Sequence, residues 1–134
     1  MKKILFVIVC FLTASQSGVF ADQPIQKVSN DSVIEVSTLD ELKQIISSLK
    51  KRVFVDFYSP HCPPCKRLSP IFKKYANENS SKGTFVKVNL NEVSGAGREY
   101  DISSMPTLLV FGPGGKLQDR VVGIPKIPNY LKEQ

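Results

Sequence analysis

Residues 53–66 read VFVDFYSPHCPPCK, and this stretch decides the fold of the chain. Its first six residues are apolar or aromatic except for Asp56, and such a continuous run is typical of a strand buried on both faces. Residues 59–64 interrupt the run, and a helix follows whose apolar face holds Leu68, Ile71, Phe72, Tyr75 and Ala76. The stretch therefore predicts a strand, a turn and a helix, with Cys62 and Cys65 where the helix begins.

Further elements are expected on both sides of this unit. Strands are predicted at 33–36, 85–90, 107–111 and 117–122, and the last two form a hairpin around the turn at 112–115. Helices are predicted after a capping box at Thr38 and over 129–134, and a short helix or turn is predicted over 94–100. The basic run 50–52 is expected to close the first helix. This order of elements in a chain of 134 residues predicts one α/β domain.

The N-terminus has the pattern of a secretory signal peptide. Lys2 and Lys3 precede an apolar run at 4–12, and Val19 and Ala21 stand three positions and one position before a cleavage point after Ala21. The run is about half of the ~20 residues that span a bilayer, so a membrane anchor is the weaker alternative. We predict a signal peptide at 1–21, a flexible leader at 22–32 and a domain at 33–134. The protein would then be exported, most simply to a bacterial periplasm.

The charge pattern argues against a nucleic-acid partner. The full chain carries a net charge of +6, and loss of Lys2 and Lys3 leaves 16 basic and 12 acidic side chains, a net charge of +4. These charges are scattered along the chain, whereas nucleic-acid-binding proteins usually carry a denser basic stripe. We therefore expect no binding of nucleic acid.

Two cysteines would remain after cleavage, Cys62 and Cys65, because Cys10 lies in the predicted signal. A disulfide across so short a loop adds little chain-entropy stabilisation, so we expect the pair to serve chemistry. If Cys62 caps the helix, backbone N–H groups of the first turn stabilise its thiolate, although Pro63 and Pro64 have no N–H to donate. The exposed Cys62 would attack a disulfide, and the deeper Cys65 would resolve the mixed disulfide. Their place between a strand and a helix favours redox chemistry.

Other side chains near the cysteines have alternative interpretations. Asp56 is either a solvated or structural residue, or a buried carboxyl with a raised pKa that exchanges a proton with Cys65, balanced by Lys87. His61 either tunes the thiolate or covers it. We expect no metal site, because structural zinc needs four ligands and two thiols with one histidine are too few.

Several motifs in a fixed order resemble the thioredoxin family. They are Val55-Asp56-Phe57-Tyr58, Cys62-Pro63-Pro64-Cys65-Lys66 with Pro70, Lys87-Val88-Asn89, Tyr100-Asp101-Ile102, Met105-Pro106-Thr107-Leu108 and Val122-Gly123. The resemblance covers residues 33–123 and implies a thioredoxin fold, an α/β architecture with a mixed central sheet of about five strands and helices on both faces. The chain departs from the family at His61, where tryptophan is usual, and at the Pro-Pro pair, where Gly-Pro is usual.

The resemblance also implies roles for particular residues. Cys62 would be the nucleophile and Cys65 the resolving thiol, with Asp56 and Lys87 as a buried proton relay. Pro106 would be cis and lie against the cysteines. A substrate strand would dock along Met105, Pro106, Val122, Gly123 and Ile124, and we place His61 beside this groove.

These observations predict an exported thiol–disulfide oxidoreductase that reduces or isomerises protein disulfides without a bound cofactor. In an oxidising compartment a reductant needs electrons from elsewhere, so we expect a membrane reductase as electron donor. The protein is expected to be a monomer. The alternatives are a periplasmic disulfide donor, a Cu(I) carrier that uses two thiolates and His61, and a binding module without turnover.

Overall fold

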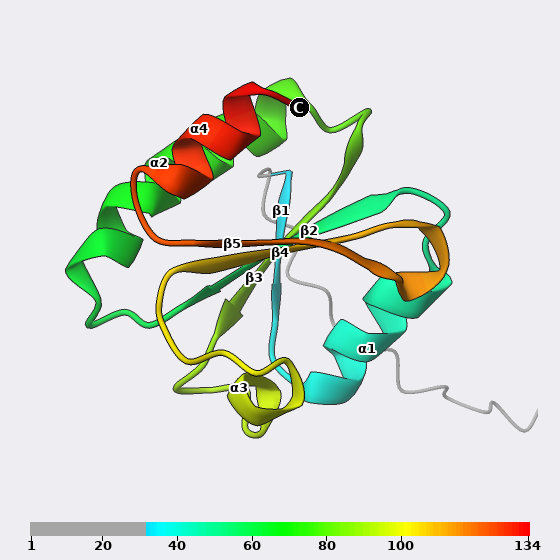
Figure 1. Cartoon of the computed structure of the whole chain (residues 1–134). Helices are drawn as coiled ribbons and strands as arrows, with labels where there is room; N and C mark the ends of the chain where they lie inside the picture. Colours follow the sequence, from blue (N-terminus) through cyan, green and yellow to red (C-terminus); the bar gives the residue numbers. More distant parts are fainter. Residues whose placement is uncertain (1–31) are drawn as a thin grey trace, which may run out of the picture.

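The computed structural model describes residues 32–134. The predicted signal peptide, the Cys10 position and almost all of the predicted leader lie outside the described residues. Along the described chain the elements are β1 (Val33–Val36), α1 (Leu39–Ser48), β2 (Arg52–Tyr58), α2 (Pro63–Glu78), β3 (Gly83–Asn89), α3 (Ala96–Glu99), β4 (Thr107–Phe111), β5 (Leu117–Val122) and α4 (Lys126–Lys132) (Figure 1). This order confirms the predicted sequence of strands and helices.

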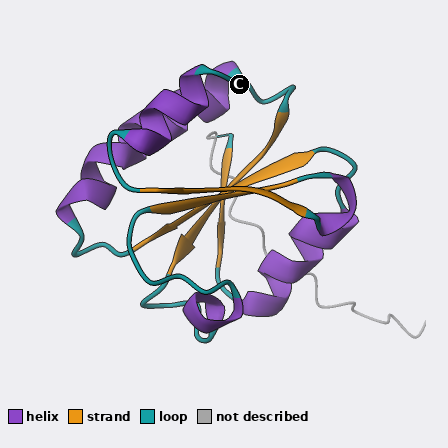
Figure 2. Cartoon of the chain, viewed as in Figure 1, coloured by secondary structure: helices purple, strands orange, loops and turns teal. Residues whose placement is uncertain are grey.

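The five strands form one mixed sheet in the order β1-β3-β2-β4-β5. β1 and β2 both run parallel to β3, whereas β4 runs antiparallel to both β2 and β5. α1 and α3 lie on one side of the sheet, and α2 and α4 lie together on the other (Figure 2). The predicted mixed α/β architecture is therefore confirmed.

β2 is the central strand, and its side chains alternate between two apolar layers. Val53, Val55 and Phe57 pack against α1 and α3, and Phe54 packs against α2 and α4. All of these side chains are buried, which explains the continuous apolar run in the sequence. Asp56 shares the face of Phe54, so its carboxyl points toward the layer that α2 covers.

Several boundaries differ from the prediction, most of all the end of α1 and the start of α4. α1 ends at Ser48, and Arg52 begins β2 rather than closing the helix. The Arg52 guanidinium lies 5.1 Å from the centre of the Phe54 ring and donates to the hydroxyl of Tyr130 and to Oε1 of Gln134. The expected helix-dipole role of this basic run was therefore wrong for Arg52, because tertiary contacts hold its side chain against α4.

The last helix begins earlier than predicted. α4 starts at Lys126 with Pro125 as its N-terminal cap, and Pro128 lies in its first turn, where a proline costs no hydrogen bond. Ile127 and Leu131 are fully buried against the α2 side of the sheet. The short helix therefore covers this flank of the sheet.

Candidate active site

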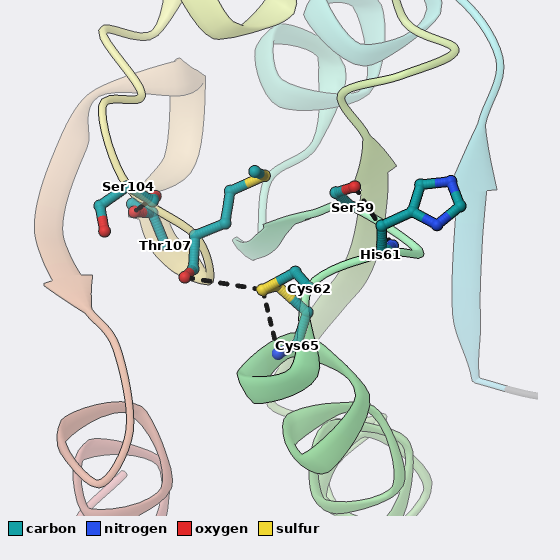
Figure 3. Close-up of a disulfide and its surroundings, with 7 residues drawn as sticks. Ser59, His61, Cys62, Cys65, Ser104 and Thr107 are labelled. Carbon is teal, nitrogen blue, oxygen red and sulfur yellow. Dashed lines mark hydrogen bonds between the residues drawn. A yellow bond between two sulfur atoms is a disulfide. The ribbon is translucent and has the colours of Figure 1, made fainter.

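Cys62 and Cys65 lie where α2 begins, and they form a disulfide in this structure (Figure 3). Cys62 is the N-terminal cap of the helix, and its Sγ accepts a hydrogen bond from the backbone N–H of Cys65 at 3.3 Å. Pro63 and Pro64 occupy the first two helical positions and donate nothing. One backbone N–H therefore faces the Cys62 sulfur inside the motif, as the sequence predicted.

The two cysteines differ in exposure. Cys65 is only 3% exposed, whereas Cys62 is partly exposed at the end of the helix. An attacking sulfur must reach a substrate disulfide, and a resolving sulfur only has to reach its neighbour. The exposures therefore fit attack by Cys62 and resolution by Cys65.

The loop before β4 lies against the cysteines. The Met105–Pro106 peptide bond is cis, as the resemblance implied, and the Met105 carbonyl oxygen is 3.7 Å from the Cys62 sulfur. Thr107 donates its hydroxyl to the Ser104 carbonyl at 2.6 Å, which braces the loop. This arrangement places the Met105 carbonyl oxygen beside the Cys62 sulfur.

The end of β5 joins the same surface. The Gly123 N–H donates to the Pro106 carbonyl at 2.9 Å, and Val122 is the register partner of Thr107. Gly123 has φ +80°, a left-handed conformation that favours glycine. Met105 and Val122 are large apolar side chains that are 37% and 39% exposed at this surface. The structure thus brings Met105, Pro106, Val122 and Gly123 together, and Ile124 follows them, partly buried.

Asp56 is fully buried under this surface. Neither carboxylate oxygen has a hydrogen-bond partner. Burial is the main cause that raises the pKa of Asp56 from 3.8 to about 7, and the positive charge of Lys87 opposes the rise. The solvated alternative for Asp56 is therefore wrong, and its carboxyl can hold or release a proton near neutral pH.

Lys87 is the register partner of Asp56 on β3 and is only 5% exposed. Its ammonium donates to the Ser69 hydroxyl at 2.8 Å and lies 4.1 Å from the centre of the Tyr58 ring. The predicted neighbours are therefore adjacent, yet the polar contacts of Lys87 go to Ser69 and Tyr58. Sequence reasoning missed Ser69, although its spacing of four residues from Cys65 on one helix was a usable signal.

His61 lies outside this network. It is exposed, and Figure 3 shows its imidazole pointing away from the disulfide. Its backbone N–H is 3.4 Å from the hydroxyl oxygen of Ser59. Within residues 32–134, no three His, Cys, Asp or Glu side chains gather as metal ligands would. In the same range, no helix is long and apolar enough to cross a membrane.

Known proteins are similar to this chain in both sequence and fold. The thioredoxin family model matches residues 33–133. Thioredoxin of Mycoplasmoides gallisepticum is 46% identical over 94 residues, which are 69% of this chain and 89% of the relative. Thioredoxin-2 of Saccharomyces cerevisiae is 40% identical over 91 residues, 68% of this chain and 86% of the relative.

Solved structures agree with these matches. The crystal structure of Malassezia sympodialis thioredoxin superposes with a TM-score of 0.69 at 35% identity and covers 77% of this chain and 87% of its own. Schistosoma mansoni thioredoxin gives a TM-score of 0.66 at 33% identity and covers 75% of this chain and 94% of its own. With the cysteine pair at the start of α2, these matches establish that the chain belongs to the thioredoxin family and is a thiol–disulfide oxidoreductase.

Proposed function

We propose that this protein is exported and reduces or isomerises disulfides of other proteins through Cys62. The observation that carries the proposal is the pairing of a partly exposed Cys62 sulfur with a fully buried, unpartnered Asp56 carboxyl. The first group can attack a disulfide, and the second can take a proton without a competing partner.

The exchange begins from the reduced pair. The Cys62 thiolate attacks one sulfur of the substrate disulfide, a mixed disulfide forms, and the other substrate sulfur leaves as a thiolate. The Asp56 carboxylate takes the proton of Cys65, directly or through water. The Cys65 thiolate then attacks the Cys62 sulfur, which forms the intramolecular disulfide and releases the second substrate thiolate. Two electrons pass from the dithiol to the substrate.

The surface around Cys62 supports a protein substrate. Met105 and Val122 expose apolar area on either side of the Pro106–Gly123 backbone contact, and Ile124 continues this edge. An extended peptide that docks here would bury apolar side chains and present its disulfide to Cys62. His61 would stand at the border of this groove. The chain would act as a monomer.

Export is supported by the N-terminal sequence. Lys2, Lys3 and the apolar run at 4–12 are typical of a signal peptide, and the periplasm is the simplest destination. The pair would then need a membrane reductase to return electrons to it.

Insulin reduction and cell fractionation test the proposal. The mature chain should precipitate insulin in the presence of a dithiol, and Cys62→Ser should lose this activity. Mass spectrometry of the protein from the periplasmic fraction should find Asp22 as the first residue. An inactive mature chain would refute the reductase, and an uncleaved chain in the cytoplasmic fraction would refute export.

A further inference from the structure

The buried ammonium of Lys87 forms no hydrogen bond with Asp56, whose carboxyl is the nearest to it in the sheet. Lys87 and Asp56 are direct register partners on β3 and β2, and both side chains are buried on the face that α2 covers. Adjacent strands are about 4.8 Å apart, so a lysine side chain is long enough to reach this carboxyl. Nevertheless, neither Asp56 oxygen has a hydrogen-bond partner.

Two contacts hold the ammonium elsewhere. Lys87 Nζ donates to Ser69 Oγ at 2.8 Å and lies 4.1 Å from the centre of the Tyr58 ring. Tyr58 follows Asp56 by two residues on the same face of β2, so the lysine extends past the carboxyl toward the end of the strand. The hydroxyl of Ser69 is the one hydrogen-bond acceptor of the ammonium among these contacts.

Ser69 is well placed for this contact. It follows Cys65 by four residues in α2, so both lie on the same face of the helix, one turn apart. Leu68 and Phe72, beside it, are fully buried and fix this part of α2 against the sheet. The hydroxyl is therefore held at a constant position relative to Cys65 and to the two strands.

We propose that Ser69 is a positioning residue, whose hydroxyl holds the Lys87 ammonium against Tyr58 and thereby prevents an ion pair with Asp56. The inference rests on the proposed proton exchange between Asp56 and Cys65. An ion pair with Lys87 would keep Asp56 ionised and would hold its oxygens in hydrogen bonds to the ammonium. An unpartnered carboxyl, in contrast, can bind and release a proton near neutral pH.

Among the groups around Asp56, Lys87 is the charged group whose position controls the pKa of this carboxyl. Its register partner on β4 is the apolar Leu108, and α2 presents Cys65 and Ser69. Tyr58 on β2 has its pKa raised first by burial and then by Glu35, Glu92 and Asp56, so it stays protonated and neutral around pH 7. Glu35 is exposed on β1, as the register partner of Lys87.

The test is a direct titration of Asp56 in the oxidised protein, where neither cysteine titrates. The carboxyl carbon of Asp56 is followed by NMR against pH in protein with labelled aspartate, and Asp56→Asn identifies its signal. Ser69→Ala should lower the pKa of Asp56 by about 1 to 3, because the released ammonium turns to the nearest buried anion. Alanine suits a helix interior, so this variant should fold. Ser69→Thr, which keeps the hydroxyl, should leave the pKa where it is.

A double-mutant cycle shows whether the effect passes through the ammonium. In a Lys87→Met background, Ser69→Ala should no longer change the pKa of Asp56. Ser48→Ala, at the exposed end of α1, serves as the matched serine control and should change nothing. An unchanged pKa in Ser69→Ala, or an effect that persists without Lys87, would overturn the inference.

The rate of disulfide exchange separates this inference from the proposed function. If Asp56 exchanges its proton with Cys65, the pH profile of the rate should move with the pKa of Asp56 in Ser69→Ala. A pKa that moves while the rate profile stays in place would support the role of Ser69 and refute the catalytic role of Asp56.

Discussion

Replacing Asp56 by asparagine should stabilise the folded protein at neutral pH, and the gain should vanish in acid. Burial raises the pKa of Asp56 from 3.8 to about 7 in the folded state, while an unfolded chain keeps the ordinary value. Between these two values the unfolded state releases its proton and the folded state retains it. Since the folded state then binds more protons, its stability falls as the pH rises from about 4 to about 7.

The size of the effect follows from the two pKa values. They differ by roughly 3, and each pKa unit corresponds to about 1.4 kcal/mol, so ionisable Asp56 costs about 4 kcal/mol above pH 7. Asparagine cannot ionise and avoids this cost. Its own buried amide adds a penalty of about 1–3 kcal/mol that does not depend on pH. The informative quantity is therefore how the difference in free energy of unfolding between Asp56→Asn and the unchanged chain varies from acid to neutral pH.

Urea unfolding of the oxidised proteins from pH 4 to pH 8 measures this quantity. The free energy of unfolding of Asp56→Asn minus that of the unchanged chain should rise by about 4 kcal/mol across the range. Asp40→Asn removes an exposed carboxylate from the first turn of α1 and is the matched control, without a comparable rise. A difference for Asp56→Asn that stays constant within about 1 kcal/mol from pH 4 to pH 8 would refute the reasoning.

Three further predictions concern the cysteine pair. Cys65→Ser should accumulate mixed disulfides with partner proteins, detected on non-reducing gels, whereas Cys62→Ser should trap few; equal trapping would contradict the assigned roles. Equilibration with glutathione should give a reduction potential of roughly −270 to −200 mV, because a single backbone N–H stabilises the Cys62 sulfur, and a value near about −120 mV would instead indicate a disulfide donor. Pro64→Ala restores the second-position N–H of α2, and one added hydrogen bond to a thiolate contributes about 1.5–3 kcal/mol, so the pKa of Cys62 should fall by about 1 to 2. Thiol alkylation against pH measures that pKa, and an unchanged value would show that the restored N–H does not reach the sulfur.

Local patterns predicted most of the fold. Thr38 caps α1 as expected and accepts a hydrogen bond from the Glu41 N–H at 3.1 Å, since a capping box depends only on neighbouring residues. The continuous apolar run at 53–58 identified the central strand, because a strand covered on both faces has no polar side. The spacing of Cys62 and Cys65 likewise identified the redox pair, since one helical turn brings the two sulfurs together.

Predictions that depended on distant partners were less accurate. Arg52 carries the charge expected near a helix end, but contacts with Tyr130 and Gln134, about 80 positions later, hold it on β2. The last helix was predicted over 129–134 but begins at Lys126, because Pro128 fits its first turn and Ile127 and Leu131 are buried in the core. No local pattern contains such contacts.

The sequence by itself determined the order of elements, the cysteine chemistry and the presence of a carboxylate in a buried strand. Periodicity, capping residues and spacing carry this information, because they act over one or two turns or along one strand. Only the tertiary structure decided that Lys87 bonds to Ser69 while Asp56 has no partner. That outcome depends on sheet register and on the packing of α2 over β2 and β3, which bring together residues from three elements. The surroundings of each charged group then determine the free energy of its ionised form.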